Sequence, residues 1–229
     1  MHIPDGFLST EVAATTAVVS AGVLGYSLKR ADALLDDRRV PLVGVTGAFI
    51  FAAQMLNFPV AGGTSGHLLG AALAAILLGP WIACLVMAVV LTAQAFVFAD
   101  GGITALGANI LNMGVVGALG VGALMFATRR VLPKSRVTLL TIAGAGAWLA
   151  VMLGAAATAV ELGISGTVPL GTVLPAMLGA HALIGVGEAV ITVAALSAVL
   201  AARPDLVAVA DLRPAELRSP APAPRAVAS

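Results

Sequence analysis

The sequence predicts an all-α fold, a polytopic transmembrane bundle of about seven helices. Of its 229 residues, 60% are hydrophobic and only 10% are charged, whereas about a quarter of the residues in a soluble domain are charged. The mean hydropathy is +1.06, and the hydrophobic residues gather in long runs, unlike the short alternating segments of an outer-membrane barrel. These observations exclude an ordinary soluble globular protein.

The charges and the single cysteine exclude further classes. The 12 Lys and Arg residues against 11 Asp and Glu residues give a net charge of +1, so we expect no nucleic-acid partner. Cys84 is the only cysteine, which rules out an intramolecular disulfide. The Gly-x4-Gly-Lys-Ser/Thr pattern of a nucleotide-binding loop does not occur, so we expect that this chain is not an ATP-hydrolysing enzyme.

Seven apolar runs predict helices that cross the hydrocarbon core, which is about 30 Å thick and needs about 20 residues. The runs lie at 8–28, 40–58, 66–79, 80–99, 109–128, 137–161 and 172–202. Residues 66–99 could instead form one kinked helix, but Gly79-Pro80 is a strong turn signal. With that turn and an outside N-terminus, every Lys and Arg falls on the inner side, which the positive-inside tendency favours. We therefore expect the N-terminus outside and the C-terminus in the cytoplasm.

The first residues can act as a metal chelator. They lack the basic and apolar regions of a signal peptide, so we expect a free α-amine on Met1, with an ordinary pKa of about 7.7–8.0. The Met1 amine, the His2 backbone nitrogen and the His2 ring Nδ1 would close a five- and a six-membered chelate ring. Such a planar nitrogen set suits Ni(II) or Cu(II), and Co(II) less strongly. The alternative is a frayed terminus in which His2 has no role.

The histidines of this sequence fall in the predicted outer half of the bundle. His67 lies at the outer start of the third helix, and as a fourth nitrogen it could complete a square with the chelate; a hydrogen-bonded interfacial histidine is the alternative. His181 lies about three turns inside the last helix. Glu161, near the outer end of the sixth helix, needs no special role because solvation is easy there.

Five polar residues are candidates for a second shell around a metal. His181 and Glu188 are seven residues apart and share one helix face, so they could orient a ligand, carry a proton or form a structural hydrogen-bonded pair. Asp100 ends the fourth helix on the outer side. Asn109 and Asn112 follow a Gly-rich loop that can present amide groups to the site. Asn109 could equally be the N-cap of the fifth helix.

Four separated motifs occur in order along the chain: Met1-His-Ile-Pro-Asp-Gly-Phe-Leu8, Gly63-Thr-Ser-Gly-His-Leu68, the stretch from Phe98 to Gly114, and His181-Ala-Leu-Ile-Gly-Val-Gly-Glu-Ala189. Together they resemble the CbiM/NikM family, the substrate-specific membrane components of energy-coupling-factor (ECF) transporters for cobalt and nickel. The resemblance covers residues 1–202, which we expect to form a transmembrane metal-binding domain. Residues 203–229, rich in Pro, Ala and Arg, lie outside it and are expected to form a disordered cytoplasmic tail.

The resemblance implies a metal site and a set of partners. Met1 would supply its amino nitrogen, His2 its backbone and ring nitrogens, and His67 the fourth donor. The cargo would be Ni(II) or Co(II), with no other cofactor, and the sequence around His67 is closer to the nickel branch. In the lipid bilayer of a prokaryotic cell membrane, the chain would work with a transmembrane coupling (T) subunit, two ATPase subunits and often a small accessory membrane protein.

Two other functions remain open on the residues alone. One is an S component for an organic micronutrient such as a vitamin, with His67 and Asp100 as hydrogen-bonding groups. The other is an intramembrane metal-dependent enzyme that uses His67, His181 and Glu188, which would need an open coordination position for water. A residue added before Met1 separates the metal and vitamin hypotheses, because only the metal site requires the free amine.

Overall fold

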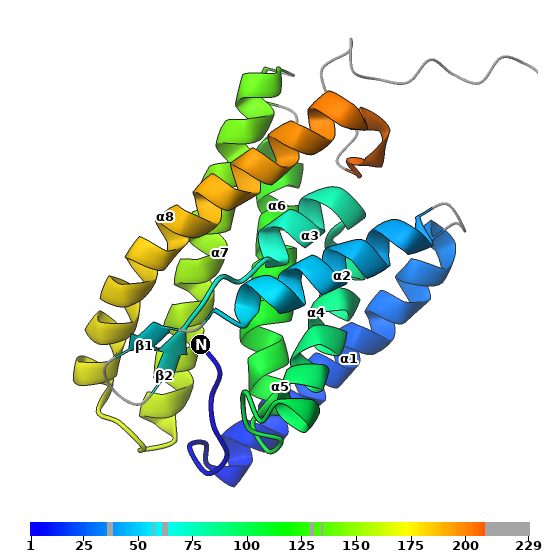
Figure 1. Cartoon of the computed structure of the whole chain (residues 1–229). Coiled ribbons are helices and arrows are strands. Elements are labelled where there is room, and N and C mark those ends of the chain that lie inside the picture. The colour runs from blue at the N-terminus through cyan, green and yellow to red at the C-terminus, as the bar shows by residue number, and fades with distance from the viewer. Residues whose placement is uncertain (36–38, 57, 61–63, 129–130, 134, 209–229) are drawn as a thin grey trace, which may run out of the picture.

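Helices make up most of the computed structural model, which describes residues 1–35, 39–56, 58–60, 64–128, 131–133 and 135–208 (Figure 1). The helices are α1 (Thr10–Leu34), α2 (Val40–Gln54), α3 (Ala71–Leu78), α4 (Pro80–Val97), α5 (Leu106–Asn109), the π-helical η1 (Ile110–Val116), α6 (Gly117–Thr128), α7 (Arg136–Ile164) and α8 (Leu170–Ala202). Because α5, η1 and α6 follow one another directly, the bundle has seven helices, which confirms the predicted fold class.

Two short strands interrupt the helical pattern between α2 and α3. Strands β1 (Phe58–Val60) and β2 (Thr64–Gly66) pair in antiparallel register, and residues 67–70 then run without helical structure. The predicted helix 66–79 therefore begins only at Ala71. Its N-cap residue, Gly70, has a left-handed φ of 77°, a conformation that glycine adopts most readily.

In the part of the chain that the structure describes, five helices are long and apolar enough to cross a membrane, namely α1, α4, the continuous α5–α6 segment, α7 and α8. Helix α2 is shorter, with 15 residues. Helix α3 has only eight residues, all of them buried, and at 1.5 Å per residue it spans less than half of a bilayer core. The chain is therefore a multi-pass membrane protein in which α3 lies in the interior of the bundle.

The turn at Gly79-Pro80 is present, which excludes the single kinked helix over 66–99. Gly79 has a φ of 91° and Pro80 is the first residue of α4. The backbone N–H of Ala208, after α8, donates to Leu77 of α3. The turn and the end of α8 therefore lie at the same end of the bundle (Figure 1).

The buried and exposed faces of α1 indicate that the bundle is surrounded by lipid. Its buried face consists of Thr16, Ser20, Ser27 and Ala31, whereas Val18 and Leu28 are 73% and 61% exposed. This inverts the pattern of a soluble helix and is typical of a helix that faces lipid. The Ser20 hydroxyl donates to the carbonyl of Gly107, 2.7 Å away, so small polar residues join α1 to the rest of the bundle.

The first residues after α8 pack on the bundle. Residues Pro204–Leu206 form a 3-10 turn, Val207 is buried, and Arg203 forms an ion pair with Asp205. The predicted tail begins at residue 203, so its first six residues are described, and the last of them, Ala208, is hydrogen-bonded to Leu77 of α3. Residues 209–229 lie outside the described part of the chain.

Candidate metal centre

The chain start lies inside the bundle. Met1 and Ile3 are fully buried and His2 is 4% exposed, although none of the three belongs to a helix. In Figure 1 the N-terminus lies between β2 and the helices of the bundle. The alternative of a frayed terminus is therefore wrong. The chain then turns at Asp5-Gly6, where Gly6 has a φ of 80°.

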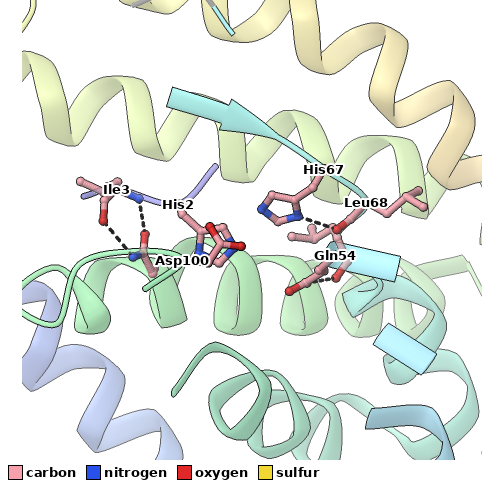
Figure 2. Close-up of polar contacts among 8 residues, drawn as sticks. His2, Ile3, Gln54, His67, Leu68 and Asp100 are labelled. Atoms are coloured by element: carbon pink, nitrogen blue, oxygen red, sulfur yellow. Dashed lines mark hydrogen bonds and ion pairs between the residues drawn. The ribbon is translucent and has the colours of Figure 1, made fainter. Parts of the chain in front are cut away.

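Backbone hydrogen bonds hold this segment in an extended conformation. The Ile3 N–H donates to Asn109 Oδ1 at 2.8 Å, and Asn109 Nδ2 donates back to the Ile3 carbonyl at 3.2 Å (Figure 2). The Gly102 N–H donates to the same carbonyl at 2.8 Å. Asn109 lies inside the continuous α5–α6 helix and makes no cap hydrogen bond. Its alternative role as an N-cap is therefore wrong, since its side chain pairs with the chain start.

The loop between α4 and α5 holds the next residues. Asp5 Oδ1 accepts from the backbone N–H and the hydroxyl of Thr104, at 2.7 and 2.6 Å. A Cβ atom on Gly102 would lie 2.3 Å from the Asp5 nitrogen, and a Cβ atom on Gly101 would lie 2.9 Å from His2 Nδ1. Gly101 also has a φ of 96°. Both glycines are therefore required for the loop to approach the chain start this closely.

His2 lies between the carboxylate of Asp100 and the ring of His67. Its Nε2 is 3.6 Å from Asp100 Oδ2, and the two imidazole centroids are 4.6 Å apart with an interplanar angle of 31°. Figure 2 shows the two histidines approaching each other from the chain start and from the segment after β2. A carboxylate favours the tautomer with a proton on Nε2, which leaves the Nδ1 lone pair for a chelate ring.

His67 is fully buried and has one ring nitrogen engaged. Its Nδ1 lies 2.7 Å from the Leu68 carbonyl (Figure 2). Because a carbonyl can only accept, Nδ1 carries the proton and Nε2 carries the lone pair. Within the described part of the chain, His67 Nε2 has no hydrogen-bond partner. A buried imidazole with one nitrogen on a carbonyl and the other unpaired is typical of a metal ligand.

Burial lowers the pKa values of the titratable groups at the site. Desolvation lowers the pKa of the Met1 amine from 8.0 to about 5, although the negative charge of Asp100 acts to raise this pKa. The pKa of His2 is lowered from 6.5 to about 4, mainly by desolvation and to a smaller extent by the positive charge of the nearby amine. Burial likewise lowers the pKa of His67 well below its ordinary value. All three groups are therefore unprotonated at neutral pH, the form that binds a metal.

The segment that carries His67 is fixed from two sides. Glu188 of α8 accepts the backbone N–H groups of Leu69 and Gly70, at 2.8 and 2.6 Å. Gln54 of α2 donates to the Leu69 carbonyl at 2.6 Å (Figure 2). Glu188 thus satisfies the backbone where α3 begins, and it holds the two residues that follow Leu68. It does not pair with His181, whose Nδ1 lies 2.8 Å from the Met177 carbonyl.

A second polar cluster lies beside the Met1 side chain. Asn112 Nδ2 donates to Glu161 at 2.6 Å and to Thr158 at 3.2 Å. A Cβ atom on Gly154 would lie 3.1 Å from the Asn112 carbonyl and 3.2 Å from Met1 Sδ. The expectation that solvent surrounds Glu161 is wrong, because this residue is only 8% exposed. Its spacing of three from Thr158 and seven from Gly154 on one helix is the sequence signal that could have revealed the cluster.

The donors available at the site differ from those of a side-chain metal site. Within the described residues, no group of three or more His, Cys, Asp or Glu side chains could hold a metal ion. Of the predicted residues, the structure brings together Met1, His2 and His67, with Asp100 facing His2. Asn109 and Glu188 hold the two segments that carry them. Any metal here would therefore need nitrogen atoms of the chain start in addition to imidazoles.

Comparisons with known proteins identify the relatives of this chain. Residues 2–206 match the family model of the cobalt uptake substrate-specific transmembrane region, CbiM. The chain is 46% identical over 209 residues to a putative fused nickel transport protein NikMN of Archaeoglobus fulgidus, covering 90% of this chain and 68% of that protein. It is also 46% identical to a putative metal transport protein of Haloquadratum walsbyi, covering 90% of this chain and 93% of the relative.

A solved structure supports the same relationship. The crystal structure of a truncated transition metal transporter superposes with a TM-score of 0.81 at 33% sequence identity, covering 88% of this chain and 99% of the other. The family match alone runs from residue 2 to beyond the end of α8. The chain therefore belongs to the CbiM family of cobalt uptake substrate-specific transmembrane regions.

Proposed function

We propose that this protein is the substrate-capture component of an ATP-driven ECF importer for Ni(II) or Co(II). The metal, which is the transported substrate, would bind to the Met1 amine, the His2 backbone nitrogen and ring, and His67. The observation that carries the proposal is the complete burial of Met1 beside two facing imidazoles. A buried amine and buried imidazoles without a ligand are costly, and a transition metal that accepts nitrogen donors offsets that cost.

The donor set also suits the proposed cargo. Adjacent nitrogens of Met1 and His2 form two fused chelate rings, and such nearly planar nitrogen sets favour Ni(II) and Cu(II). Low pKa values at the Met1 amine and His2 mean that few protons must be displaced at neutral pH. Cobalt and nickel both accept these donors, so the proposal includes both ions.

The cavities favour a metal over an organic micronutrient. Small-molecule sites usually have about 300–1,000 Å³ and a few polar groups that fix the ligand. The cavity that includes Leu68, Gly70 and Glu188 has a volume of only 10 Å³. A groove of 390 Å³ lies between α2 and α4, but apolar residues and glycines line it and none of the three histidines does. Neither cavity is lined by Met1, His2 or His67, and the larger one offers an organic micronutrient no polar side chain.

The remaining parts of the proposal concern the assembly. The chain would work with a transmembrane coupling subunit, two ATPase subunits and often a small accessory membrane protein, in the cell membrane of a prokaryote. The N-terminal side of α1 and the N-terminal side of α8 would face outside, so that the site receives metal from there. Lys29 and Arg30 lie near the C-terminal end of α1, Arg136 begins α7 and Arg203 follows α8. The positive-inside tendency would put these helix ends on the inner side.

An uptake assay in cells tests the proposal. Cells that lack other nickel importers would express this chain with its coupling and ATPase subunits, and accumulation of radioactive nickel and cobalt would be measured. We expect uptake that stops when the ATPase is inactivated and that falls to background in His2→Ala and His67→Ala variants. Equal uptake by the wild type and both variants would contradict the proposed site. Uptake that continues without ATP hydrolysis would contradict the ECF mechanism.

A further inference from the structure

The side chain of Met1 is fully buried, although it belongs to the first residue of the chain. None of its surface is exposed, and it is among the largest side chains that are completely buried in the bundle. The first residues of a domain are usually poorly ordered unless contacts tie them down. The proposed metal site uses only the amine of Met1, so it does not account for the burial of the thioether side chain.

A glycine of α7 makes room for this side chain. A Cβ atom on Gly154 would lie 3.2 Å from Met1 Sδ and 3.6 Å from Met1 Cε. The same Cβ atom would lie 3.1 Å from the backbone carbonyl oxygen of Asn112, which belongs to the π-helical η1. The end of the Met1 side chain therefore lies against bare backbone where α7 and η1 approach each other. We call the place formed by Gly154 and the Asn112 carbonyl the Met1 slot.

The surroundings of the Met1 slot suit a methionine. The neighbours of Gly154 on α7 include Ala150, Val151 and Ala155, which are small or apolar and buried. Methionine is unbranched and has a polarisable sulfur, so it fills irregular apolar gaps of this kind. An alanine at position 1 would leave the slot empty, and an unfilled cavity is unfavourable.

The Met1 slot fixes one end of the proposed chelate. Asn109 and Gly102 hold the backbone of Ile3, on one side of His2. The slot holds Met1, on the other side. His2 therefore lies between two fixed residues, and the amine and the His2 backbone nitrogen keep their relative positions before a metal arrives. A binding group that is already ordered loses less conformational freedom when its ligand binds.

We propose that the Met1 side chain is a positioning residue, which holds the α-amine in place by filling the Met1 slot. This inference rests on the proposed function and leaves its four nitrogen donors unchanged, since the sulfur packs against α7. Nickel affinity should therefore depend on the size and shape of the first side chain. The same nitrogens in a free peptide have no slot, so they should not show this dependence.

Changing the first side chain tests the inference. A fusion partner that is cleaved off before residue 1 allows the full chain to start with Met, Leu or Ala, and nickel affinity is measured in detergent by competition with a chelator. We expect Met1→Ala to bind nickel at least about tenfold more weakly than the wild type, because its slot is empty. Met1→Leu, which keeps most of the volume, should lose less. Short peptides with the same first residues, starting with Met or Ala, are the control and should agree within about twofold.

A second measurement reports the Met1 slot without a metal. In the metal-free proteins, an acylating reagent would modify the α-amine, and mass spectrometry of the N-terminal peptide would follow the rate. We expect slow modification in the wild type and in Met1→Leu, where the chain start stays buried. Modification should be faster in Met1→Ala, because the first residue is no longer anchored.

The possible results separate this inference from the proposed function. Equal nickel affinity of the wild type and Met1→Ala, in proteins that bind nickel, would overturn the positioning role and leave the proposed function intact. Rapid modification of the wild-type amine would also overturn it, because the side chain would not hold the chain start. A wild type whose amine is protected but which binds no nickel would instead contradict the proposed function.

Discussion

The side chain of Asn109 pairs with the backbone of Ile3, 106 residues earlier in the chain, through two hydrogen bonds of 2.8 and 3.2 Å. A side-chain amide can donate and accept at once, so Asn109 satisfies both polar groups of one buried backbone residue. This pair fixes the residue that follows His2. Asn109 therefore positions the proposed chelate without contacting the metal.

Replacing Asn109 should weaken metal binding through the chain start. In Asn109→Leu, the buried N–H of Ile3 loses its partner, which costs about 1–3 kcal/mol. We expect a loss of nickel affinity of about 5- to 150-fold, measured by competition with a chelator of known affinity. Asn112→Leu is an informative comparison, because Asn112 bonds to Glu161 and Thr158, not to the chain start. An unchanged affinity in Asn109→Leu would contradict the positioning role.

Gly102 should tolerate no side chain. In Gly102→Ala, the new Cβ atom would lie 2.3 Å from the Asp5 nitrogen and 2.6 Å from the Pro4 carbonyl carbon, so one of the two segments must move. We expect the chain start to leave its buried position and nickel affinity to fall at least tenfold, a loss of about 1.4 kcal/mol.

A protease that cleaves near the N-terminus gives a direct readout of this displacement. Gly102→Ala should be cleaved faster than the wild type, because the chain start is no longer buried. Gly171→Ala is the matched control, since a Cβ atom there meets nothing within 4 Å. Equal cleavage of the wild type and Gly102→Ala would show that the segment accommodates the methyl group.

Glu188 should control the segment that carries His67. In Glu188→Gln, one of the two N–H groups of Leu69 and Gly70 faces an amide NH₂ group, so one hydrogen bond is lost. We expect faster amide hydrogen exchange at these two residues and a loss of nickel affinity of about tenfold. Thr192→Val, one turn further along α8, should change neither. Slow exchange at Leu69 and Gly70 in Glu188→Gln would mean that other contacts hold the segment.

The pKa values of the chain start predict how many protons the metal displaces. With the Met1 pKa at about 5 and the His2 pKa at about 4, both groups are unprotonated at pH 7. Only the His2 backbone N–H then has to ionise, so binding should release about one proton. Calorimetry in buffers of different ionisation enthalpy measures this number. A free peptide with the same first residues, whose amine is mostly protonated at pH 7, should release about two.

The same pKa values set the range of acid sensitivity. Nickel affinity should fall more steeply below about pH 5, where the amine and then His2 take up protons. Because both pKa values are lower in the folded than in the unfolded chain, the unfolded state binds more protons as the pH falls from about 8 towards 4. The metal-free protein should therefore lose stability over that range. A stability that is constant from pH 8 to pH 5 would contradict the burial of the neutral amine.

The sequence predicted the bundle well because hydrophobic length is a local property. Runs of apolar residues and the Gly79-Pro80 turn together define seven helices. The start of α3 could not be predicted in the same way. Residues 66–70 are as apolar as a helix, and they are non-helical because Glu188, 119 residues from Leu69, binds the Leu69 and Gly70 backbone.

The candidate site likewise has a part that local sequence predicts and a part that it does not. Met1 and His2 could be proposed because adjacent nitrogens form chelate rings, a property of neighbouring residues, and His67 because of its predicted position and the family resemblance. The partners of the site depend on contacts between distant segments, as in the pairing of Asn109 with Ile3. Glu161 was misjudged for that reason: its position near a helix end indicated solvent, whereas Asn112 of another helix covers it.

The central claim is that the amino group of Met1 binds the metal together with His2 and His67. Equilibrium dialysis against nickel, followed by elemental analysis, would compare the native start with a variant that carries one extra glycine before Met1. We predict one nickel ion per native chain and a loss of binding in the extended variant, because the extra residue moves the amine away from the site. Equal nickel content and affinity in the two proteins would contradict the claim.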